Sequence, residues 1–196
     1  MLDRHPTIRI ARAGDAEAIH AIYAPHVESG VATFENVLPG VDGMRERMLA
    51  RLPHYPWLVW EEGGTVLAYA YAGRFRERAA YDWIAETSIY VHPDAQRRGI
   101  ARRLYGTLLG VMRLQGLTQA VGVITLPGTP SVTLHEAMGF APAGVWRKAG
   151  WKLDAWWDVG VWQKELQAAT PSPPAVTPFA TLASTPALQA LLQRDS

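Results

Sequence analysis

The sequence contains no cysteine, and this absence removes several chemistries at once. A chain without cysteine has no disulfide, no cysteine-ligated zinc site and no cysteine nucleophile. Runs of about 18 or more apolar residues, the length that a membrane-spanning helix needs, are also missing. The first ten residues carry no apolar segment typical of a secretory signal. We therefore expect a cytoplasmic protein that does not bind a membrane.

Excess charge of one sign is missing as well, because 19 basic residues stand against 18 acidic ones. A nucleic-acid-binding chain usually shows a basic excess, so no nucleic-acid partner is expected. The glycine-rich fingerprints of dinucleotide-binding and NTP-binding folds are absent. His135-Glu136 is not followed by a second histidine at 139, where a zinc-protease helix would place it. No bound metal is expected.

The chain has 196 residues, of which 48% are hydrophobic and 19% are charged. These values predict one globular domain, which we place at residues 1–166. Residues 167–196 are rich in proline, alanine and threonine, and have few bulky side chains. Such a composition favours an extended or disordered tail. A short helix over 186–194, with its leucines on one side, is the alternative there.

Strand and helix patterns alternate along the domain. Period-two alternation and apolar runs predict strands at 7–12, 57–61, 65–72, 82–91, 119–126, 140–148 and 156–165. Helical spacing predicts helices at 16–28, 41–52, 98–115 and 131–138, with Pro25 ending or kinking the first. The unit from strand 82–91 through helix 98–115 to strand 119–126 is a parallel crossover, whereas the hairpins around it must be antiparallel. The fold class is therefore α+β with a mixed sheet.

The junction between strand 82–91 and the following helix has the composition of an anion site. Gly99 and Ala101 allow a ligand to approach the backbone closely. The first N–H groups of a helix have no internal partners and lie at its positive end, an arrangement that suits a pyrophosphate. Four arginines between 97 and 103 add positive charge. The same residues are also compatible with a solvated helix start or with a local nucleic-acid patch.

Residues 96–101 (QRRGIA) resemble the Q/R-x-x-G-x-G/A element of the GCN5-related N-acetyltransferase superfamily, and 131–140 (SVTLHEAMGF) is similar to a second segment of it. Blocks at 55–59, 70–73, 80–83, 86–91 and 158–160 extend the likeness over residues 8–165 and closely resemble phosphinothricin N-acetyltransferases. The resemblance implies a mostly antiparallel sheet, splayed between two parallel central strands and flanked by helices. It also implies acetyl transfer from acetyl-CoA to the free amine of a small amino acid or analogue, of the phosphinothricin or methionine sulfoximine type.

The resemblance implies a co-substrate site for acetyl-CoA built on two stretches of chain. The backbone of one stretch would pair with the pantetheine arm, and the other would bind the pyrophosphate. These residues are Ile89, Tyr90 and Val91, and Arg97, Arg98, Gly99, Ile100, Ala101 and Arg102, respectively. Gly128 departs from the family, which usually has an asparagine there that bonds the cofactor. Stronger reliance on residues 97–102, or weaker binding, is the expected result.

Two residues are candidates for catalysis. Glu86 is a carboxylate in an otherwise uncharged strand, either an outward-facing position or a general base whose pKa burial raises. The resemblance implies the base. His135 is either a surface histidine of its helix or a catalytic group. The resemblance places it where most superfamily members have a tyrosine that protonates the leaving thiolate.

The acceptor and partner sites complete the hypothesis. Arg74, Arg76 and Arg78 are either a charged loop or a fork that binds a carboxylate. The resemblance implies that Phe34, Arg78 and Tyr81 contact the acceptor. Tryptophans near the last strands (Trp151, Trp156, Trp157) suggest a homodimer. The alternatives are an acetyltransferase for a protein N-terminus or polyamine, and a non-catalytic acyl-CoA-binding module.

Overall fold

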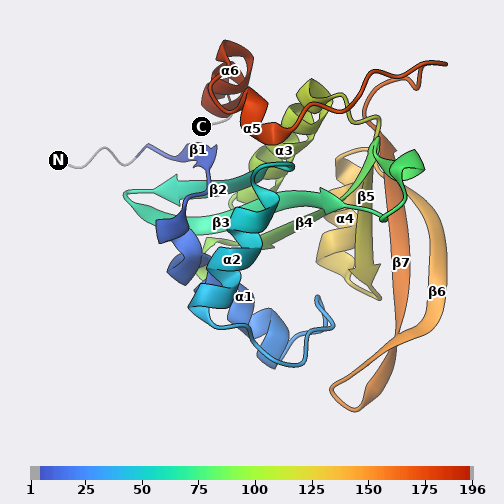
Figure 1. The fold of residues 1–196 in the computed structure, drawn as a ribbon. Coiled ribbons are helices and arrows are strands. Elements are labelled where there is room, and N and C mark those ends of the chain that lie inside the picture. Colours follow the sequence, from blue (N-terminus) through green and yellow to red (C-terminus); the bar gives the residue numbers. More distant parts are fainter. Residues whose placement is uncertain (1–4, 195–196) are drawn as a thin grey trace.

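Seven strands form one mixed sheet in the order β1-β2-β3-β4-β5-β7-β6 in the computed structural model, which describes residues 5–194 (Figure 1). Only β4 and β5 pair in parallel within this range. The strands are β1 Thr7–Ile10, β2 Trp57–Glu62, β3 Thr65–Arg74, β4 Ile84–Val91, β5 Gln119–Thr125, β6 Ala141–Lys152 and β7 Ala155–Glu165. This arrangement confirms the predicted α+β fold with a mostly antiparallel sheet.

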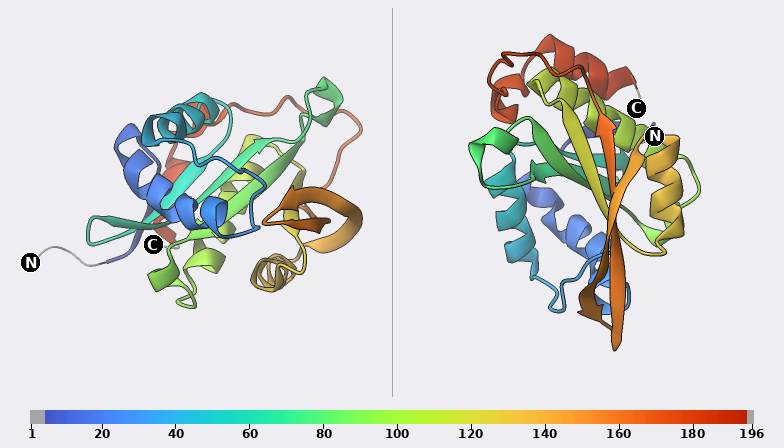
Figure 2. Two further views of the ribbon diagram at one scale, coloured as in Figure 1. Left: turned by 90° about the horizontal axis from the view of Figure 1, so that it is seen from below. Right: turned by 90° about the vertical axis from the view of Figure 1, so that its right-hand side faces the viewer.

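Helices cover both faces of the sheet, as the side views in Figure 2 show. The helices α1 (Ala16–Glu28) and α2 (Val41–Arg51) close one buried cluster with the sheet. On the other face lie α3 (Ile100–Gln115), α4 (Thr129–Ala137), α5 (Phe179–Leu182) and α6 (Pro186–Arg194). No helix among residues 5–194 has the length and apolar character needed to cross a membrane.

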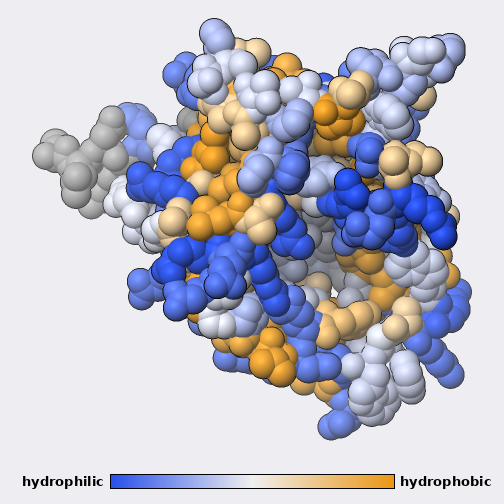
Figure 3. Space-filling view, in the orientation of Figure 1, coloured by the Kyte–Doolittle hydropathy of each residue, from blue (hydrophilic) through white to orange (hydrophobic). Residues whose placement is uncertain are grey.

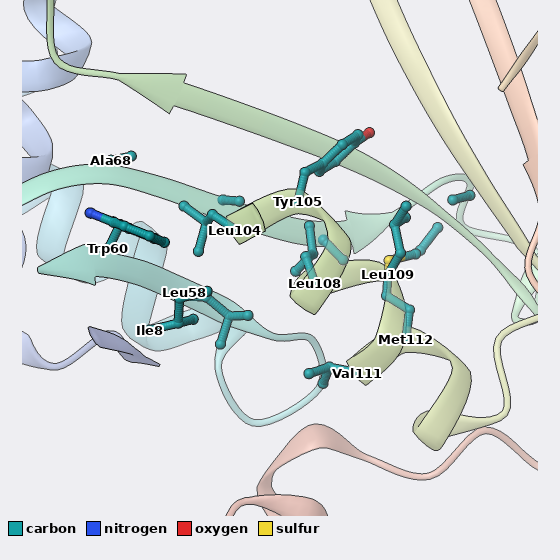
Figure 4. Close-up of a cluster of buried hydrophobic side chains, with 14 of the residues drawn as sticks. Ile8, Leu58, Trp60, Ala68, Leu104, Tyr105, Leu108, Leu109, Val111 and Met112 are labelled. Atoms are coloured by element: carbon teal, nitrogen blue, oxygen red, sulfur yellow. The ribbon is translucent and has the colours of Figure 1, made fainter. Parts of the chain in front are cut away.

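The apolar stripe of α3 fills the centre of the second cluster (Figure 4). Leu104, Leu108 and Met112 are fully buried against Leu58 and Trp60 of β2. Burying one such side chain contributes about 1.5–3 kcal/mol to stability. The helix is therefore a rigid support for whatever its N-terminus binds.

The parallel strands separate halfway along their length. Their pairing runs from Ile84 opposite Gln119 to Thr87 opposite Gly122 and then stops, although both strands continue. β4 stays bonded to β3 and β5 to β7, so that the backbone is free only where the two strands diverge. The sheet thus has the splay that the resemblance implies.

Element bounds differ from prediction at particular residues. Pro25 lies inside α1, and the helix continues past it to Glu28. The main crossover helix begins at Ile100 rather than at 98, because Gly99 has a φ of 79° and forms the N-cap. The last two strands form a hairpin that extends to Lys152 on one side and begins at Ala155 on the other.

The segment predicted as an extended tail differs most. Residues 179–194 form α5 and α6, with Phe179 and Leu188 completely buried against α3. Gly110 of α3 has no side chain, which lets Leu191 approach closely. The few bulky residues of this segment are spaced to cover one helix, and that spacing outweighs its proline-rich composition. Residues 1–4 and 195–196, which belong to the predicted domain and tail, lie outside the described range.

Candidate active site

A cavity of about 660 Å³ opens where β4 and β5 diverge. It is bounded by the two strands, the N-terminus of α3, the segment 30–32 and α4 with the loop before it. Eight of the nine predicted cofactor residues line it: Ile89, Tyr90, Val91, Arg97, Gly99, Ile100, Ala101 and Arg102. The structure therefore brings the predicted strand and the predicted loop together around one space.

The backbone at the start of α3 is shaped for an anion. Arg97 has a φ of 60° and Gly99 a φ of 79°, so two left-handed residues frame the turn. Such turns point successive N–H groups into one concavity, which binds phosphate groups. No atom lies within 4 Å of the position where a Cβ of Gly99 would stand. The free strand edges, the turn and the cations Arg97 and Arg102 together fit an extended, multiply phosphorylated ligand such as acetyl-CoA.

Arg98 is the predicted cofactor residue that does not line the cavity. Its Nη2 donates a hydrogen bond to Oε2 of Glu62 over 2.6 Å, which ties the α3 turn to the β2–β3 hairpin. Nearby, the guanidinium of Arg103 lies 4.7 Å from the ring centre of Trp60 in the same hairpin. Both side chains stabilise the position of the turn and are turned away from the cavity.

Gly128 lines the cavity at the N-cap of α4, in a left-handed conformation. A Cβ at this position would overlap the carbonyl oxygen of Thr125 and lie 2.6 Å from Cγ2 of Ile124. The backbone of this chain therefore has no room for the asparagine that the family usually has here.

Glu86 lies on β4, directly opposite Gly73 of β3, and its side chain faces the α1 and α2 side of the sheet. Burial raises the pKa of the carboxyl, while Arg76 and Arg51 oppose the change. Within residues 5–194, no hydrogen-bond donor or cation within ion-pair distance contacts the carboxylate. Half-buried and unpaired, it can accept a proton.

His135 is buried on α4, so it is not the surface residue that was one of its two interpretations. Its Nδ1 lies 2.8 Å from the carbonyl oxygen of Ser131, and its Nε2 lies 3.0 Å from the hydroxyl of Tyr105. The ring packs over Gly122 of β5, where a Cβ would overlap Nε2. Burial lowers the pKa of the imidazole, and the Ser131 carbonyl raises it.

Two residues that the sequence analysis did not select join His135. The hydroxyl of Tyr105 lies 2.6 Å from Oγ1 of Thr87, which lies 3.0 Å from the carbonyl oxygen of Val121. Tyr105 falls on the apolar stripe of α3, and its pattern alone predicts a core aromatic. The only sequence signal was indirect: Gly122 interrupts an apolar strand, which often marks a close approach.

The predicted acceptor residues lie in the loop between α1 and α2 and in the β3–β4 connection. Phe34 lies against Gly150 of β6, where a Cβ would overlap its ring. Lys152 of β6 donates hydrogen bonds to the carbonyl oxygens of Thr33 in the α1–α2 loop and of His26 in α1. Arg78 and Tyr81 lie in the β3–β4 connection, six and three residues before β4 begins.

The arginines of that connection are not equivalent. Arg74 lies 3.6 Å from carboxylate oxygens of both Glu77 and Asp82, so acidic groups already accompany it. Arg76 stacks on Phe75 and acts electrostatically on Glu86. In Figure 3 the surface is hollowed beside α1 and α2, on the side that faces β6 and β7. No group of three or more possible metal ligands occurs in the part of the chain that the structure describes.

Glu86 and His135 lie on opposite faces of the sheet. Glu86 pairs with Val121 and Thr87 with Gly122, so both catalytic candidates meet the last paired residues before the strands diverge. His135 lines the cavity, whereas Glu86 is not among the residues that line it.

Comparison with known proteins agrees with this geometry. Residues 8–161 match the acetyltransferase (GNAT) domain family. The phosphinothricin N-acetyltransferase of Streptomyces viridochromogenes is 40% identical over 177 residues, covering 88% of this chain and 94% of that protein. The L-methionine sulfoximine/L-methionine sulfone acetyltransferase of Salmonella typhimurium is 33% identical, over 82% and 94% respectively.

Solved structures give the same result. A GNAT phosphinothricin acetyltransferase from Sinorhizobium meliloti, in complex with acetyl-CoA, superposes with a TM-score of 0.83 at 36% identity. The match covers 89% of this chain and 96% of that one. The resemblance that the motifs suggested is thereby confirmed, and the chain belongs to the GNAT family of acetyltransferases.

Proposed function

We propose that this acetyl-CoA-dependent N-acetyltransferase acetylates the α-amine of small amino acids and their analogues, of the phosphinothricin and methionine sulfoximine type. The observation that carries the proposal is the unpaired, half-buried Glu86 beside the start of the splay. Burial holds its pKa above the usual value, which suits a base that takes a proton from an ammonium group.

The residues around the cavity have separable tasks in this proposal. The free backbone of residues 89–91 pairs with the pantetheine arm like an added strand. The turn 97–102 binds the pyrophosphate, with Arg98 acting through its hold on Glu62. A backbone N–H near the splay stabilises the oxyanion as the amine attacks the thioester. His135 is the source of the proton that the thiolate needs.

The acceptor end favours an anionic molecule. Arg78 and Tyr81 bind the acceptor carboxylate, and Phe34 forms one wall of the pocket. Residues 74–82 carry three arginines against the two acidic residues Glu77 and Asp82, and this net positive charge disfavours a polyamine. Homologues named for phosphinothricin and methionine sulfoximine support an acceptor with an α-amine, an α-carboxylate and a short polar side chain.

The test is release of coenzyme A with a panel of acceptors. Phosphinothricin, methionine sulfoximine and methionine sulfone should release it, whereas their N-acetylated forms should not. Spermidine and a peptide with a free N-terminus serve as the competing acceptors. Turnover confined to one of these two would overturn the proposal, and binding of acetyl-CoA without any turnover would indicate a non-catalytic module.

We also infer a homodimer in the cytoplasm. The large exposed hydrophobic residues concentrate on the β6–β7 hairpin, which projects from the body in Figure 2. They are Val145, Trp146, Trp151, Leu153 and Trp156. Aromatic residues are enriched at protein interfaces, and a second copy would cover this edge. Light scattering at micromolar protein should report twice 21.6 kDa; a monomer mass would contradict the dimer.

A further inference from the structure

Both ring nitrogens of His135 already have partners within the protein. The carbonyl oxygen of Ser131 can only accept and lies 2.8 Å from Nδ1, closer than the hydroxyl of the same residue at 3.4 Å, so this geometry favours a proton on Nδ1 in the neutral ring. Nε2 faces the hydroxyl of Tyr105, which can donate or accept. Although His135 borders the cavity, it cannot donate a proton there without breaking one of these bonds.

The hydroxyls beyond His135 form a chain with a fixed direction for each charge state. When the imidazole is neutral, Tyr105 donates to Nε2 and Thr87 donates to Tyr105. When the imidazole is charged, Nε2 donates to Tyr105, Tyr105 donates to Thr87, and Thr87 donates to the carbonyl oxygen of Val121. The hydrogen-bonded network therefore has partners for both charge states of the imidazole. The charged state has one additional hydrogen bond, from Thr87 to the Val121 carbonyl, which offsets part of the cost of burying the charge.

We propose that His135, Tyr105 and Thr87 form a proton relay, and that the hydroxyl of Thr87 rather than the imidazole protonates the sulfur of coenzyme A. This inference rests on the proposed function. As the thioester carbon–sulfur bond breaks, the Thr87 hydroxyl turns from the Val121 carbonyl to the sulfur and gives it its proton, Thr87 takes the proton of Tyr105, and Tyr105 takes that of Nε2. A thiolate and an imidazolium become a thiol and a neutral imidazole, with the neutral chain already in place.

The position of Thr87 supports its place at the cavity end of the relay. Thr87 lines the cavity and is the last β4 residue paired with β5, where the strands begin to diverge. Tyr105 is completely buried and does not border the cavity. Figure 4 shows its ring rising from α3 toward β4, with the hydroxyl turned away from the rest of the apolar cluster.

Among residues 5–194, burial and the Ser131 carbonyl are the causes that shift the pKa of His135, and no charged group joins them. Tyr105 faces it from α3, Thr87 borders the network from β4, Gly122 lies against it from β5, and Phe140 contacts it edge-on. On its own helix, Ser131 holds Nδ1. The carboxylate of Glu136 accepts a hydrogen bond from Nε1 of Trp162 instead. The proton on Nε2 can therefore leave only through Tyr105.

Kinetics of matched variants test the relay. Thr87→Val keeps the shape without the hydroxyl and should lower kcat roughly 100-fold, the lower end of the usual contribution of acid catalysis. The KM for acetyl-CoA should change less than about threefold. Thr87→Ser restores the hydroxyl and should restore kcat. Tyr105→Phe should resemble Thr87→Val, because it interrupts the same chain.

The pH profile separates the relay from a structural role. Wild-type kcat should fall as pH rises through the pKa of His135, because the relay then lacks its proton. Tyr105→Phe should remove that limb. Tyr23→Phe is the control, since it removes a similar hydroxyl contact, 2.8 Å to Oγ1 of Thr33, on the other face of the sheet. It should keep the shape of the profile.

Nuclear magnetic resonance of ¹⁵N-histidine protein gives a readout that does not require turnover. Neutral His135 should carry its proton on Nδ1, and Tyr105→Phe should lower its pKa because the charged ring loses its acceptor. A proton on Nε2 in the neutral ring would overturn the relay, as would normal kcat and pH dependence in Thr87→Val and Tyr105→Phe. Wild-type protein that releases no coenzyme A would overturn the proposed function, and the delivery step with it.

Discussion

The cavity between β4 and β5 is shaped mainly by backbone, whereas the surroundings of Glu86 are shaped by side chains. The cavity is shaped by backbone: two left-handed residues at the α3 turn, free strand edges, and glycines at 122 and 128 where side chains would collide. The surroundings of Glu86 depend on side chains, because Arg51 of α2 and Arg76 of the β3–β4 connection act on its carboxylate. A backbone site binds a constant ligand, whereas a side-chain site can be altered one residue at a time.

Among all the substitutions considered, Glu86→Gln should lower activity the most. We expect kcat/KM to fall by roughly 10²–10⁴, the usual contribution of a general base. In the wild type the base must be ionised, so kcat/KM should rise with pH through the pKa of Glu86, and Gln should remove this acid limb. Steady-state kinetics across pH check both effects, and turnover that the variant leaves unaltered at every pH would return Glu86 to a structural role.

The same substitution has an opposite effect on stability. Because burial raises the folded-state pKa of Glu86, the folded protein binds more protons than the unfolded chain, and stability falls as pH rises above the usual glutamate pKa. Glu86→Gln should therefore be more stable than the wild type at neutral pH but not at low pH. Thermal unfolding at the two pH values measures the difference.

Gly99→Val tests the backbone turn at the start of α3. The φ of 79° disfavours a β-branched residue, and its side chain would enter the space left for the pyrophosphate. We expect the KM for acetyl-CoA to rise by at least about tenfold, with a smaller change in kcat and in acceptor KM. Calorimetric titration with acetyl-CoA measures the affinity directly, and normal affinity would exclude the turn as the pyrophosphate site.

Arg78→Ala sharpens the contrast within the acceptor pocket. A paired arginine and carboxylate is a strong contact, so KM should rise about tenfold for an α-amino acid but little for its carboxamide. Arg74→Ala is the matched control, because Glu77 and Asp82 already accompany that guanidinium. Equal losses on the acid and the carboxamide would mean that Arg78 does not bind the carboxylate.

Gly128→Asn should have the smallest effect on catalysis and a measurable one on stability. It restores the residue that the family usually has, but its Cβ would overlap the carbonyl oxygen of Thr125. We expect no gain in acetyl-CoA affinity and a loss of about 1–3 kcal/mol in the free energy of unfolding, typical of overpacking. Tighter binding with unchanged unfolding would show that the loop adjusts freely.

The cavity between β4 and β5 was also easier to predict from the sequence than the surroundings of Glu86. Gly99 and Ala101 after a strand predict an anion site by local rules, and the structure places both at the cavity. The role of Arg98 could not be predicted by these local rules, because its partner Glu62 lies 36 positions away in the chain, at the end of β2. Tyr105 was missed because its spacing along α3 is that of a core residue, and only the tertiary position of Thr87 and His135 reveals the use of its hydroxyl.

The fold of the last segment was predicted only in part, since the alternative helix over 186–194 is confirmed as α6 but its packing on the core was not expected. Composition predicted an extended chain, but composition cannot report that the outer face of α3 lacks a cover without Phe179, Leu188 and Leu192. The leucine spacing at 186–194 did indicate a helix. The leucine spacing predicts where this helix packs only once the uncovered surface of α3 is known.

The contact of α5 and α6 with the core has a consequence for synthesis of the protein on the ribosome. The cluster that Phe179 and Leu188 complete also contains Ile8 from β1, about 170 residues earlier in the chain. At about 5–20 residues per second, the ribosome needs on the order of 10–30 s to make the intervening chain. Phe179 follows the end of α3 at Gln115 by 64 residues, so for about the last 3–13 s of that interval α3 is made but lacks the cover that α5 and α6 give it.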